Sequence, residues 1–274
     1  MILDGQKVAQ VIYEKLKKEL KWLASKPKLA VILVGENPAS ESYVKIKEET
    51  AKAIGIDFEL FKFASDIDET EVISRIELLN NDTEVSGVLV QLPLPAHFDE
   101  TRVLQSISPK KDVDGLNALN LGKMLMGLEA LYPATALAVL EILDFYEIPI
   151  EGRHAVVIGK SNLVGKPVAD MLLNRSATVT VCHERTEDLQ FFCKRADILV
   201  SAVGKANLIG ADMIKDGSVI IDVGVNKVGN KLVGDVDFKE GRKRASAITP
   251  VPGGVGPVTV VMLMKNVFQA YKEA

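Results

Sequence analysis

A glycine-rich turn in the second half of the chain has residue types and spacing that could bind a phosphate group. An apolar run after Gly152 ends at Gly159, and a polar turn leads to Gly165, where a helix-like pattern begins. Glycines let a backbone approach a ligand closely, and the free N–H groups at a helix start favour a phosphate. The turn therefore predicts a dinucleotide site, with a strand–turn–helix that binds no ligand as the alternative.

The spacing of this turn departs from two familiar fingerprints. Its second glycine is one place too far along for a P-loop, and Lys166 is followed by proline instead of serine or threonine. Ser161 stands where the second glycine of G-x-G-x-x-G would be. By itself the turn is thus only moderately specific for a dinucleotide.

A second group of polar residues lies in the first half of the chain. Tyr43 and Lys47 share one face of a predicted helix near the strand ends, although a lysine beside an aromatic ring is often just a solvated charge. Gln91 ends an apolar strand and either satisfies nearby backbone groups or points into a pocket. Asp112 and Asp114 lie in a glycine-containing loop that could equally be a plain turn.

The segment from Thr249 to Pro257 contains three prolines and three glycines, which fix an unusual backbone path. It follows a predicted strand and precedes a predicted helix. A rigid interdomain turn is one interpretation. We favour a ligand-binding loop, because the segment lies beyond the carboxyl end of a strand.

These candidates need a scaffold of alternating strands and helices. The apolar runs predict strands over 29–34, 58–63, 87–92, 155–158, 178–182, 198–203, 219–223 and 247–249. Helical spacing predicts helices over about 8–23, 40–54, 72–79, 103–107, 134–146, 168–172 and 258–271, and Gly229-Asn230 predicts a hairpin. This alternation indicates two α/β domains with mostly parallel sheets and a cleft between them, the second domain being Rossmann-like. We expect the first over 1–136, with 257–274 packing back on it, and the second over 137–256.

Composition excludes several classes of protein. The 274 residues are 47% hydrophobic with a net charge of -4, and no basic stripe indicates nucleic acid. The N-terminus does not resemble a signal peptide, and no apolar run approaches the roughly 18 residues that span a bilayer, so we expect a cytoplasmic protein without membrane association. Cys182 and Cys193 predict buried, reduced thiols, and the three scattered histidines indicate no structural metal.

Six motifs, in the right order along essentially the whole chain, carry a family resemblance. They are Asn-Pro-Ala-Ser with Tyr43-x-x-x-Lys47, Val-Gln-Leu-Pro-Leu-Pro, Lys-Asp-Val-Asp-Gly, Gly-Lys-Ser-x-x-Val-Gly-Lys-Pro, Asp-Val-Gly-Val-Asn and Thr-Pro-Val-Pro-Gly-Gly-Val-Gly-Pro. Each motif alone is modest, but together they resemble the bifunctional methylenetetrahydrofolate dehydrogenase/methenyltetrahydrofolate cyclohydrolase family, often called FolD.

The resemblance implies NADP-dependent oxidation of 5,10-methylenetetrahydrofolate and hydrolysis of the product to 10-formyltetrahydrofolate. These reactions belong to one-carbon metabolism, which serves purine, histidine and methionine biosynthesis. The resemblance also implies a folate-binding first domain and a homodimer formed through the sheet edge of the second domain.

Roles for individual residues follow from the same resemblance. Lys47 matches the catalytic lysine, Tyr43 the ring that stacks on the substrate, Gln91 the amide that tunes the lysine, and Asp114 the carboxylate that holds the pterin. The other substrate-binding positions are Ser40, Pro252, Gly253 and Gly254. The cofactor-binding positions are Gly159, Lys160, Ser161, Gly165, Glu184 and Val225.

Two positions depart from the commonest family pattern. Tyr132 to Ala136 replace the usual Pro-Cys-Thr-Pro, and we expect activity to be retained. Glu184 stands where many members have serine, close to where an acidic residue would bind the ribose of NAD. Glu184 by itself slightly favours NAD, although Lys160 and Arg185 could neutralise it and still accept a 2′-phosphate. The family resemblance favours NADP more strongly, so we predict NADP as the cofactor and keep NAD as an alternative.

Three other functions remain as alternatives. A monofunctional NAD-dependent methylenetetrahydrofolate dehydrogenase would lack hydrolysis, and Lys47 with Gln91 argues against it. A nucleotide-binding module without activity leaves these polar residues without a purpose. A hydroxy-acid dehydrogenase would need a carboxylate anchor, which we do not find in the first domain.

Overall fold

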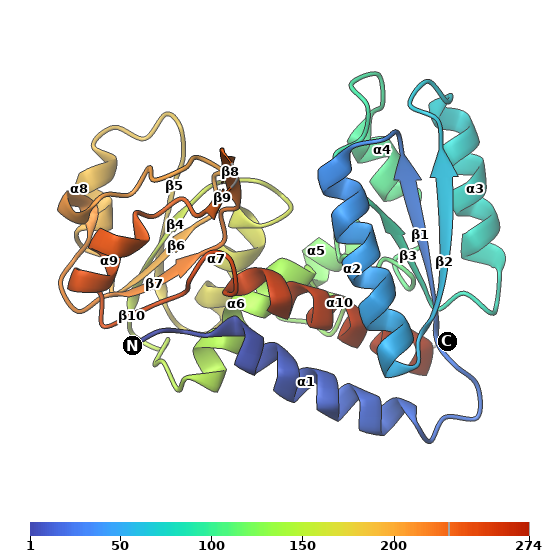
Figure 1. Ribbon diagram of the computed structural model, residues 1–274, viewed down its shortest axis with the longest axis horizontal. Coiled ribbons are helices and arrows are strands. Elements are labelled where there is room, and N and C mark those ends of the chain that lie inside the picture. The colour runs from blue at the N-terminus through green and yellow to red at the C-terminus, as the bar shows by residue number, and fades with distance from the viewer. Residues whose placement is uncertain (230, 274) are drawn as a thin grey trace. The chain divides into compact units, whose positions relative to one another are not determined.

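The computed structural model describes residues 1–229 and 231–273, which form two compact α/β units (Figure 1). Unit 1 consists of Met1–Gln10, Met124–Gly127 and Thr135–Thr259. Unit 2 consists of Val11–Lys123, Leu128–Ala134 and the C-terminal residues from Val260. Two helices, α1 (Gly5–Leu20) and α10 (Val255–Lys272), each begin in unit 1 and continue into unit 2.

Unit 2 is built on a three-stranded parallel sheet in the order β2–β1–β3. Its strands are β1 (Lys28–Val34), β2 (Asp57–Phe63) and β3 (Gly87–Val90). Its helices include α2 (Pro38–Ile54), α3 (Glu69–Asn81) and α4 (Glu100–Gln105), and α5 (Ala118–Leu125) begins in this unit. Alternate β1 residues from Ala30 to Val34 pack with α3 and α4 in one apolar core, while α2 contacts β1 and β2. Coverage of both faces explains why β1 is a continuous apolar run.

Helix α2 has strong start and stop signals. The side-chain oxygen of Asn37 accepts hydrogen bonds from the N–H groups of Ala39 and Ser40, and Pro38 opens the first turn. The helix ends at Gly55, whose φ of 97° is left-handed. These signals fix the helix that carries Tyr43 and Lys47.

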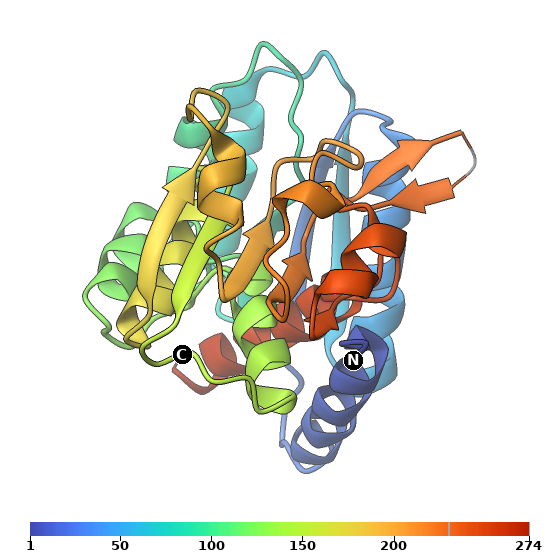
Figure 2. The same cartoon turned by 90° about the vertical axis from the view of Figure 1, so that its left-hand side faces the viewer.

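Unit 1 contains a five-stranded parallel sheet in the order β10–β7–β6–β4–β5 (Figure 2). Its strands are β4 (His154–Ile158), β5 (Thr178–Cys182), β6 (Ile198–Ser201), β7 (Val219–Asp222) and β10 (Ala247–Ile248). Its helical segments include α6 (Ala134–Phe145), α7 (Gly165–Asn174), α8 (Leu189–Cys193), η1 (Ala211–Met213) and α9 (Phe238–Arg244). An antiparallel pair, β8 (Asn226–Val228) and β9 (Lys231–Val233), flanks the predicted hairpin turn, of which Asn230 lies outside the described residues.

The predicted fold class is confirmed, and the observed strands match the predicted ones to within two residues at each end. The sequence did not predict α5, α8, α9 or η1, all of eight residues or fewer, because such short segments give a weak periodicity, and among the short helices only α4 was predicted, over 103–107. The unusual Tyr132 to Ala136 segment does not prevent a helix, since α6 starts at Ala134.

The predicted burial of the cysteines is confirmed, since Cys182 and Cys193 are buried free thiols. Burial raises the pKa of Cys193 to about 12, so this thiol stays protonated. Within residues 1–229 and 231–273, the helices are too short or too polar to cross a membrane.

Candidate active site and cofactor pocket

In unit 2, the ammonium group of Lys47 donates a hydrogen bond of 2.9 Å to the side-chain oxygen of Gln91. Lys47 lies on α2, the helix that follows β1, and Gln91 directly follows β3. The chain leaves β1 towards β2 on one side, while β3 lies on the other, so the pair sits at the switch point of the sheet. Ligands bind at such points in open α/β sheets.

The amide of Gln91 is held in a fixed orientation. Its nitrogen donates a 2.7 Å hydrogen bond to the carbonyl of Leu92, which leaves its oxygen for Lys47. The hydroxyl of Ser40 reaches the same carbonyl at 3.4 Å. Gln91 is only 9% exposed and Ser40 only 3%, so this small network is shielded from bulk water.

Lys47 and Asp114 form an electrostatic pair. Burial lowers the pKa of the Lys47 ammonium, and the charge of Asp114 partly opposes this shift. Burial raises the pKa of Asp114, against the attraction of Lys47. An amine with a depressed pKa can exchange protons near neutral pH, which is the property needed in a general acid or base.

The two aspartates of the 112–114 loop differ in environment. Asp112 is 1% exposed and accepts hydrogen bonds from the backbone of Asn117 and the side chain of Asn120, so its role is to hold the start of α5. Asp114 interacts with Lys47 instead. The carboxylate of Asp112 thus has a structural role in the turn, whereas that of Asp114 interacts with the Lys47 ammonium.

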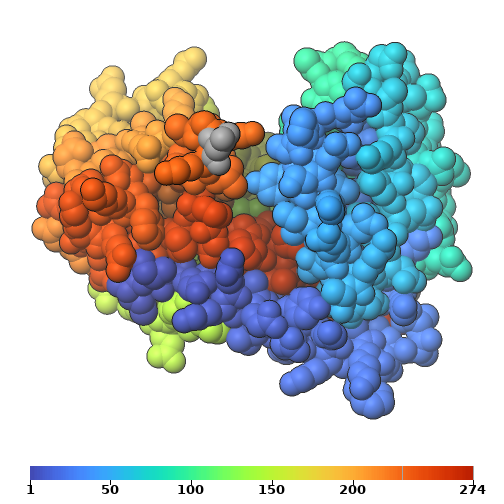
Figure 3. Space-filling model, viewed as in Figure 1, coloured from blue at the N-terminus to red at the C-terminus, as the bar shows by residue number. Residues whose placement is uncertain are grey.

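Tyr43 lies one helical turn before Lys47 and is 43% exposed. In Figure 3, α2 covers much of the visible face of unit 2. Ser40, Lys47 and Gln91 form the shielded polar network, and the ring of Tyr43 lies beside it. An exposed ring in this position can stack on a flat ligand.

Unit 1 contains a cavity of about 680 Å³ at the carboxyl ends of β4, β5 and β6. It lies at the second switch point, because β5 and β6 flank β4 on opposite sides. The residues that line it are Ile158, Gly159, Lys160, Ser161, His183, Glu184, Thr186, Leu189, Ala202, Val203, Lys205 and Leu208. Both its place in the sheet and its mixture of apolar and cationic groups suit a dinucleotide.

The glycines of the predicted turn allow two backbone segments to come together. A Cβ at Gly165 would collide with the backbone of Gly159, and Gly159 itself has a left-handed φ of 123° beside Ala202. The hydroxyl oxygen of Ser161 accepts hydrogen bonds from the N–H groups of Val164 and Gly165, at 3.1 and 3.3 Å. Ser161 thus shapes the start of α7 in addition to lining the cavity.

Lys160 and Glu184 form an ion pair of 2.9 Å at the mouth of this cavity. Both side chains are about half exposed, and the hydrogen bond from Lys160 lowers the pKa of Glu184. The sequence predicts that a cation neutralises Glu184, and in the structure that cation is Lys160. The position of Glu184, just beyond β5, matches that of the ribose-binding acid in NAD sites.

The remaining candidates also lie in unit 1. Val225 is 44% exposed and follows β7, outside the lining of the cavity. Pro252, Gly253 and Gly254 precede α10, and the carbonyl of Gly253 accepts a 2.9 Å hydrogen bond from the N–H of Gly5. A Cβ on Gly5 would collide with Gly254, so this loop packs tightly against the first residues of the chain.

Several lining residues were not found from the sequence, above all Lys205, His183 and Val203. Their shared signal is position, since each lies just beyond the carboxyl end of β5 or β6. The sequence predicts both strands, but residue types such as valine and histidine in a loop do not indicate a ligand by themselves.

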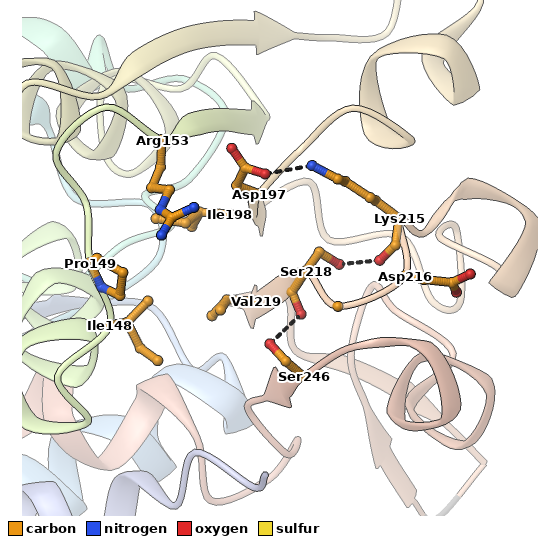
Figure 4. A pocket seen from close by; sticks show the side chains of 11 residues that line it. Ile148, Pro149, Arg153, Asp197, Ile198, Lys215, Asp216, Ser218, Val219 and Ser246 are labelled. Carbon is orange, nitrogen blue, oxygen red and sulfur yellow. Dashed lines mark hydrogen bonds and ion pairs between the residues drawn. The ribbon is translucent and has the colours of Figure 1, made fainter.

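A second cavity of about 370 Å³ opens at the amino ends of β6 and β7 (Figure 4). Lys215 forms an ion pair with Asp197 there, and Asp216 pairs with Arg244. The described residues contain no group of three or more His, Cys, Asp or Glu side chains that could hold a metal ion.

Comparison with known proteins gives consistent matches. Residues 3–114 match the sequence model of the tetrahydrofolate dehydrogenase/cyclohydrolase catalytic domain, and residues 133–274 match that of the NAD(P)-binding domain. The bifunctional protein FolD of Nitratiruptor sp. is 50% identical, covering 99% of this chain and 98% of the relative.

Solved structures agree with these matches. The bifunctional FolD enzyme from Campylobacter jejuni superposes with a TM-score of 0.98 at 45% identity, covering 100% of this chain and 99% of that one. The Trypanosoma brucei methylenetetrahydrofolate dehydrogenase-cyclohydrolase, solved with NADP cofactor and inhibitor, has a TM-score of 0.95 at 37% identity, with 100% and 97% coverage.

Proposed function

Since this chain belongs to the tetrahydrofolate dehydrogenase/cyclohydrolase family, we propose how its two sites carry out the family's two reactions. The enzyme oxidises 5,10-methylenetetrahydrofolate to 5,10-methenyltetrahydrofolate with NADP and hydrolyses the product to 10-formyltetrahydrofolate. The observation that carries the hydrolytic assignment is the hydrogen bond between Lys47 and Gln91, beside Asp114.

The cavity of unit 1 fits the cofactor. Its glycine turn permits close approach of a backbone to a phosphate, and α7 directs its N-terminus to the same place. Gly159, Lys160, Ser161 and Gly165 form the phosphate turn in this proposal. When bound, NADP supplies the hydride acceptor for the dehydrogenase reaction.

Oxidation of the substrate needs orientation more than acid or base catalysis. The two nitrogens that flank the methylene carbon stabilise the amidinium cation left when hydride departs, so the protein must chiefly hold the substrate in place. Asp114 would accept paired hydrogen bonds from the amino and ring N–H groups of the pterin, and Tyr43 would stack on its ring. We also propose Ser40 of unit 2 and Pro252, Gly253 and Gly254 of unit 1 as folate-binding residues, and Val225 as a cofactor-binding residue outside the lining of the cavity.

Hydrolysis of the amidinium needs proton transfer. The attacking water must lose a proton, and a ring nitrogen must gain one as the bridge opens. Lys47 is suited to move that proton, because burial lowers the pKa of its ammonium. Gln91 holds the amine in position without adding a charge that would raise that pKa. This pair distinguishes a bifunctional enzyme from a dehydrogenase that lacks hydrolysis.

The ion pair at the cavity mouth bears on cofactor choice. With Glu184 neutralised by Lys160, a second cation, Lys205, still lines the cavity and could bind the 2′-phosphate of NADP. We therefore propose NADP as the preferred cofactor, and NAD as a poorer one that uses Glu184 for its ribose hydroxyls.

We further propose a homodimer formed through β5, the edge strand of the five-stranded sheet. Val181 on this strand is 40% exposed and Leu173 on the neighbouring α7 is 56% exposed, which gives the edge an apolar surface. Val181→Lys should shift the mass measured by light scattering from dimer to monomer. A cytoplasmic location is part of the proposal, since two free thiols suit a reducing compartment.

One experiment tests the function as a whole. Methylenetetrahydrofolate is supplied with NADP or NAD, and reduced nicotinamide and formyl product are followed together. Reduced cofactor followed by formyl product is expected. Reduced cofactor with accumulation of the methenyl compound at its uncatalysed hydrolysis rate would contradict the hydrolytic role of Lys47.

A further inference from the structure

Asp235 is a fully buried carboxylate in unit 1 that is surrounded by hydrogen-bond donors. It accepts hydrogen bonds from the hydroxyl of Ser201, the N–H groups of Val203, Gly204 and Lys205, and the side-chain amide of Asn226. The three backbone bonds measure 2.8, 3.3 and 2.8 Å. Such an array fixes the positions of the groups that donate to it.

Three of these donors belong to one short loop beside the cavity of unit 1. Val203 and Lys205 line the cavity directly, and Gly204 lies between them. This short loop follows β6 and belongs to no helix or strand, so its path depends on contacts from elsewhere. Asp235 supplies that contact from a segment 30 to 32 residues further along the chain.

A second buried aspartate holds Asp235 in place. Asp222, at the end of β7 and 3% exposed, accepts hydrogen bonds of 3.0 and 2.9 Å from the N–H groups of Asp235 and Val236. It also accepts the N–H of Gly224. Asp222 therefore joins the end of a strand to the segment that carries Asp235.

Two glycines make room for this arrangement. A Cβ on Gly224 would collide with the carboxylate of Asp235, and a Cβ on Gly234 would collide with that of Asp222. At each glycine the backbone therefore lies against a buried carboxylate, with no room for a side chain.

We propose that Asp235, seated by Asp222, is a positioning residue for the cofactor, because it sets the path of residues 203–205 along the cavity wall. The proposal rests on the proposed function in one respect, namely that the dinucleotide is the ligand of this cavity. Asp235 does not touch the ligand in this account. It acts through the backbone of the loop and through the placement of Lys205.

The test uses Asp235→Asn in the full-length enzyme. This change keeps one oxygen acceptor but turns an NH2 group against N–H donors, so the loop must shift. We expect faster hydrogen exchange at the amides of Val203, Gly204 and Lys205 in the absence of cofactor. Calorimetry should show a Kd for NADP raised about tenfold or more.

The hydrolytic reaction provides an internal control, because it is measured on methenyltetrahydrofolate without NADP and uses Lys47 of unit 2. It should stay within about twofold of the wild type. Asp197→Asn is the matched variant, since Asp197 accepts the N–H of His154 and pairs with Lys215 at the opposite end of the same sheet. It should lower stability without changing NADP affinity.

An unchanged Kd and unchanged exchange in folded Asp235→Asn would overturn the proposal, as would an equal loss of affinity in Asp197→Asn. Should Asp235→Asn fail to fold, Ser201→Ala decides, because it removes one donor and leaves the carboxylate. A rise of about threefold in Kd with faster exchange supports the proposal, and wild-type values overturn it. Failure of the proposed function has a different signature, since the wild-type enzyme would then bind no NADP.

Discussion

The ammonium of Lys47 and the side-chain oxygen of Gln91 are joined by a 2.9 Å hydrogen bond that links the helix after β1 to the end of β3. The two residues are 44 positions apart in the sequence and meet only because parallel strands bring their carboxyl ends to one edge. The amine is desolvated there, and its partner carries no charge.

Replacement of this amine should abolish hydrolysis. We expect Lys47→Met to lower the cyclohydrolase rate by roughly 100-fold or more, because no other group would take up its proton transfer. Melting temperature and NADP affinity should stay unchanged. Lys45→Met is the control, since Lys45 is an exposed lysine on the same helix. Near-normal hydrolysis by Lys47→Met would remove this residue from the mechanism.

A charged partner should shift the pH dependence of hydrolysis. Gln91→Glu places a carboxylate against Lys47, which stabilises the ammonium and raises its pKa. The free amine then forms only at higher pH, so the rising limb of the pH–rate profile should move upward. A profile that moves to lower pH, or does not move, would show that the amine of Lys47 does not control that limb.

The two aspartates of one loop should respond in opposite ways. Asp114→Asn should strongly lower both activities. Its free energy of unfolding should be kept, because the change removes a buried charge that is costly to hold in the folded protein. Asp112→Asn should cost about 1–3 kcal/mol in the free energy of unfolding, because it disturbs the bonds to Asn117 and Asn120. Urea unfolding and both assays on each variant check this contrast. Equal effects of the two variants would contradict it.

Cofactor preference should depend on Glu184. Glu184→Ser frees Lys160 from its ion pair, so we expect KM for NADP to fall and KM for NAD to rise, shifting the ratio by roughly tenfold. Glu187→Ser makes the same charge change three residues further on, outside the cavity lining, and should leave the ratio alone. A matching shift in both variants would indicate a general effect of charge.

The free energy of unfolding should decrease as pH rises, because Asp222 must ionise in the folded protein. Burial and the nearby charge of Asp235 raise the pKa of Asp222 to about 6, above its ordinary value of 3.8. Between these two pH values the unfolded chain has already released the proton that the folded chain still holds, so ionisation favours unfolding. Relative to Asp222→Asn, the wild type should lose on the order of 2–3 kcal/mol as pH rises from about 4 to 6. Urea unfolding of the wild type and Asp222→Asn across this range measures the difference in their free energies of unfolding. If the wild type does not lose stability relative to the variant as pH rises, the raised pKa is contradicted.

The sequence predicts the parallel strands well because their apolar runs, such as 29–34, are local signals bounded by glycine or proline. The candidates Lys160, from the family resemblance, and Glu184, from its place after a predicted strand, both line the cavity of unit 1. Asp235 was not found, because its importance comes from backbone donors 30 to 32 residues away that only the folded chain brings together. The short helix α8 was not predicted for a different reason, namely that five residues are too few to show the helical periodicity of apolar residues.

The close approach of Gly224 to Asp235 and of Gly234 to Asp222 has an evolutionary consequence. Even one added methyl group at either glycine would displace a carboxylate, and loss of the carboxylate would remove the need for the glycine. Substitution at one member of a pair should therefore be accepted only with a compensating change at the other. Across related enzymes, these four positions should be inherited as a set or lost together.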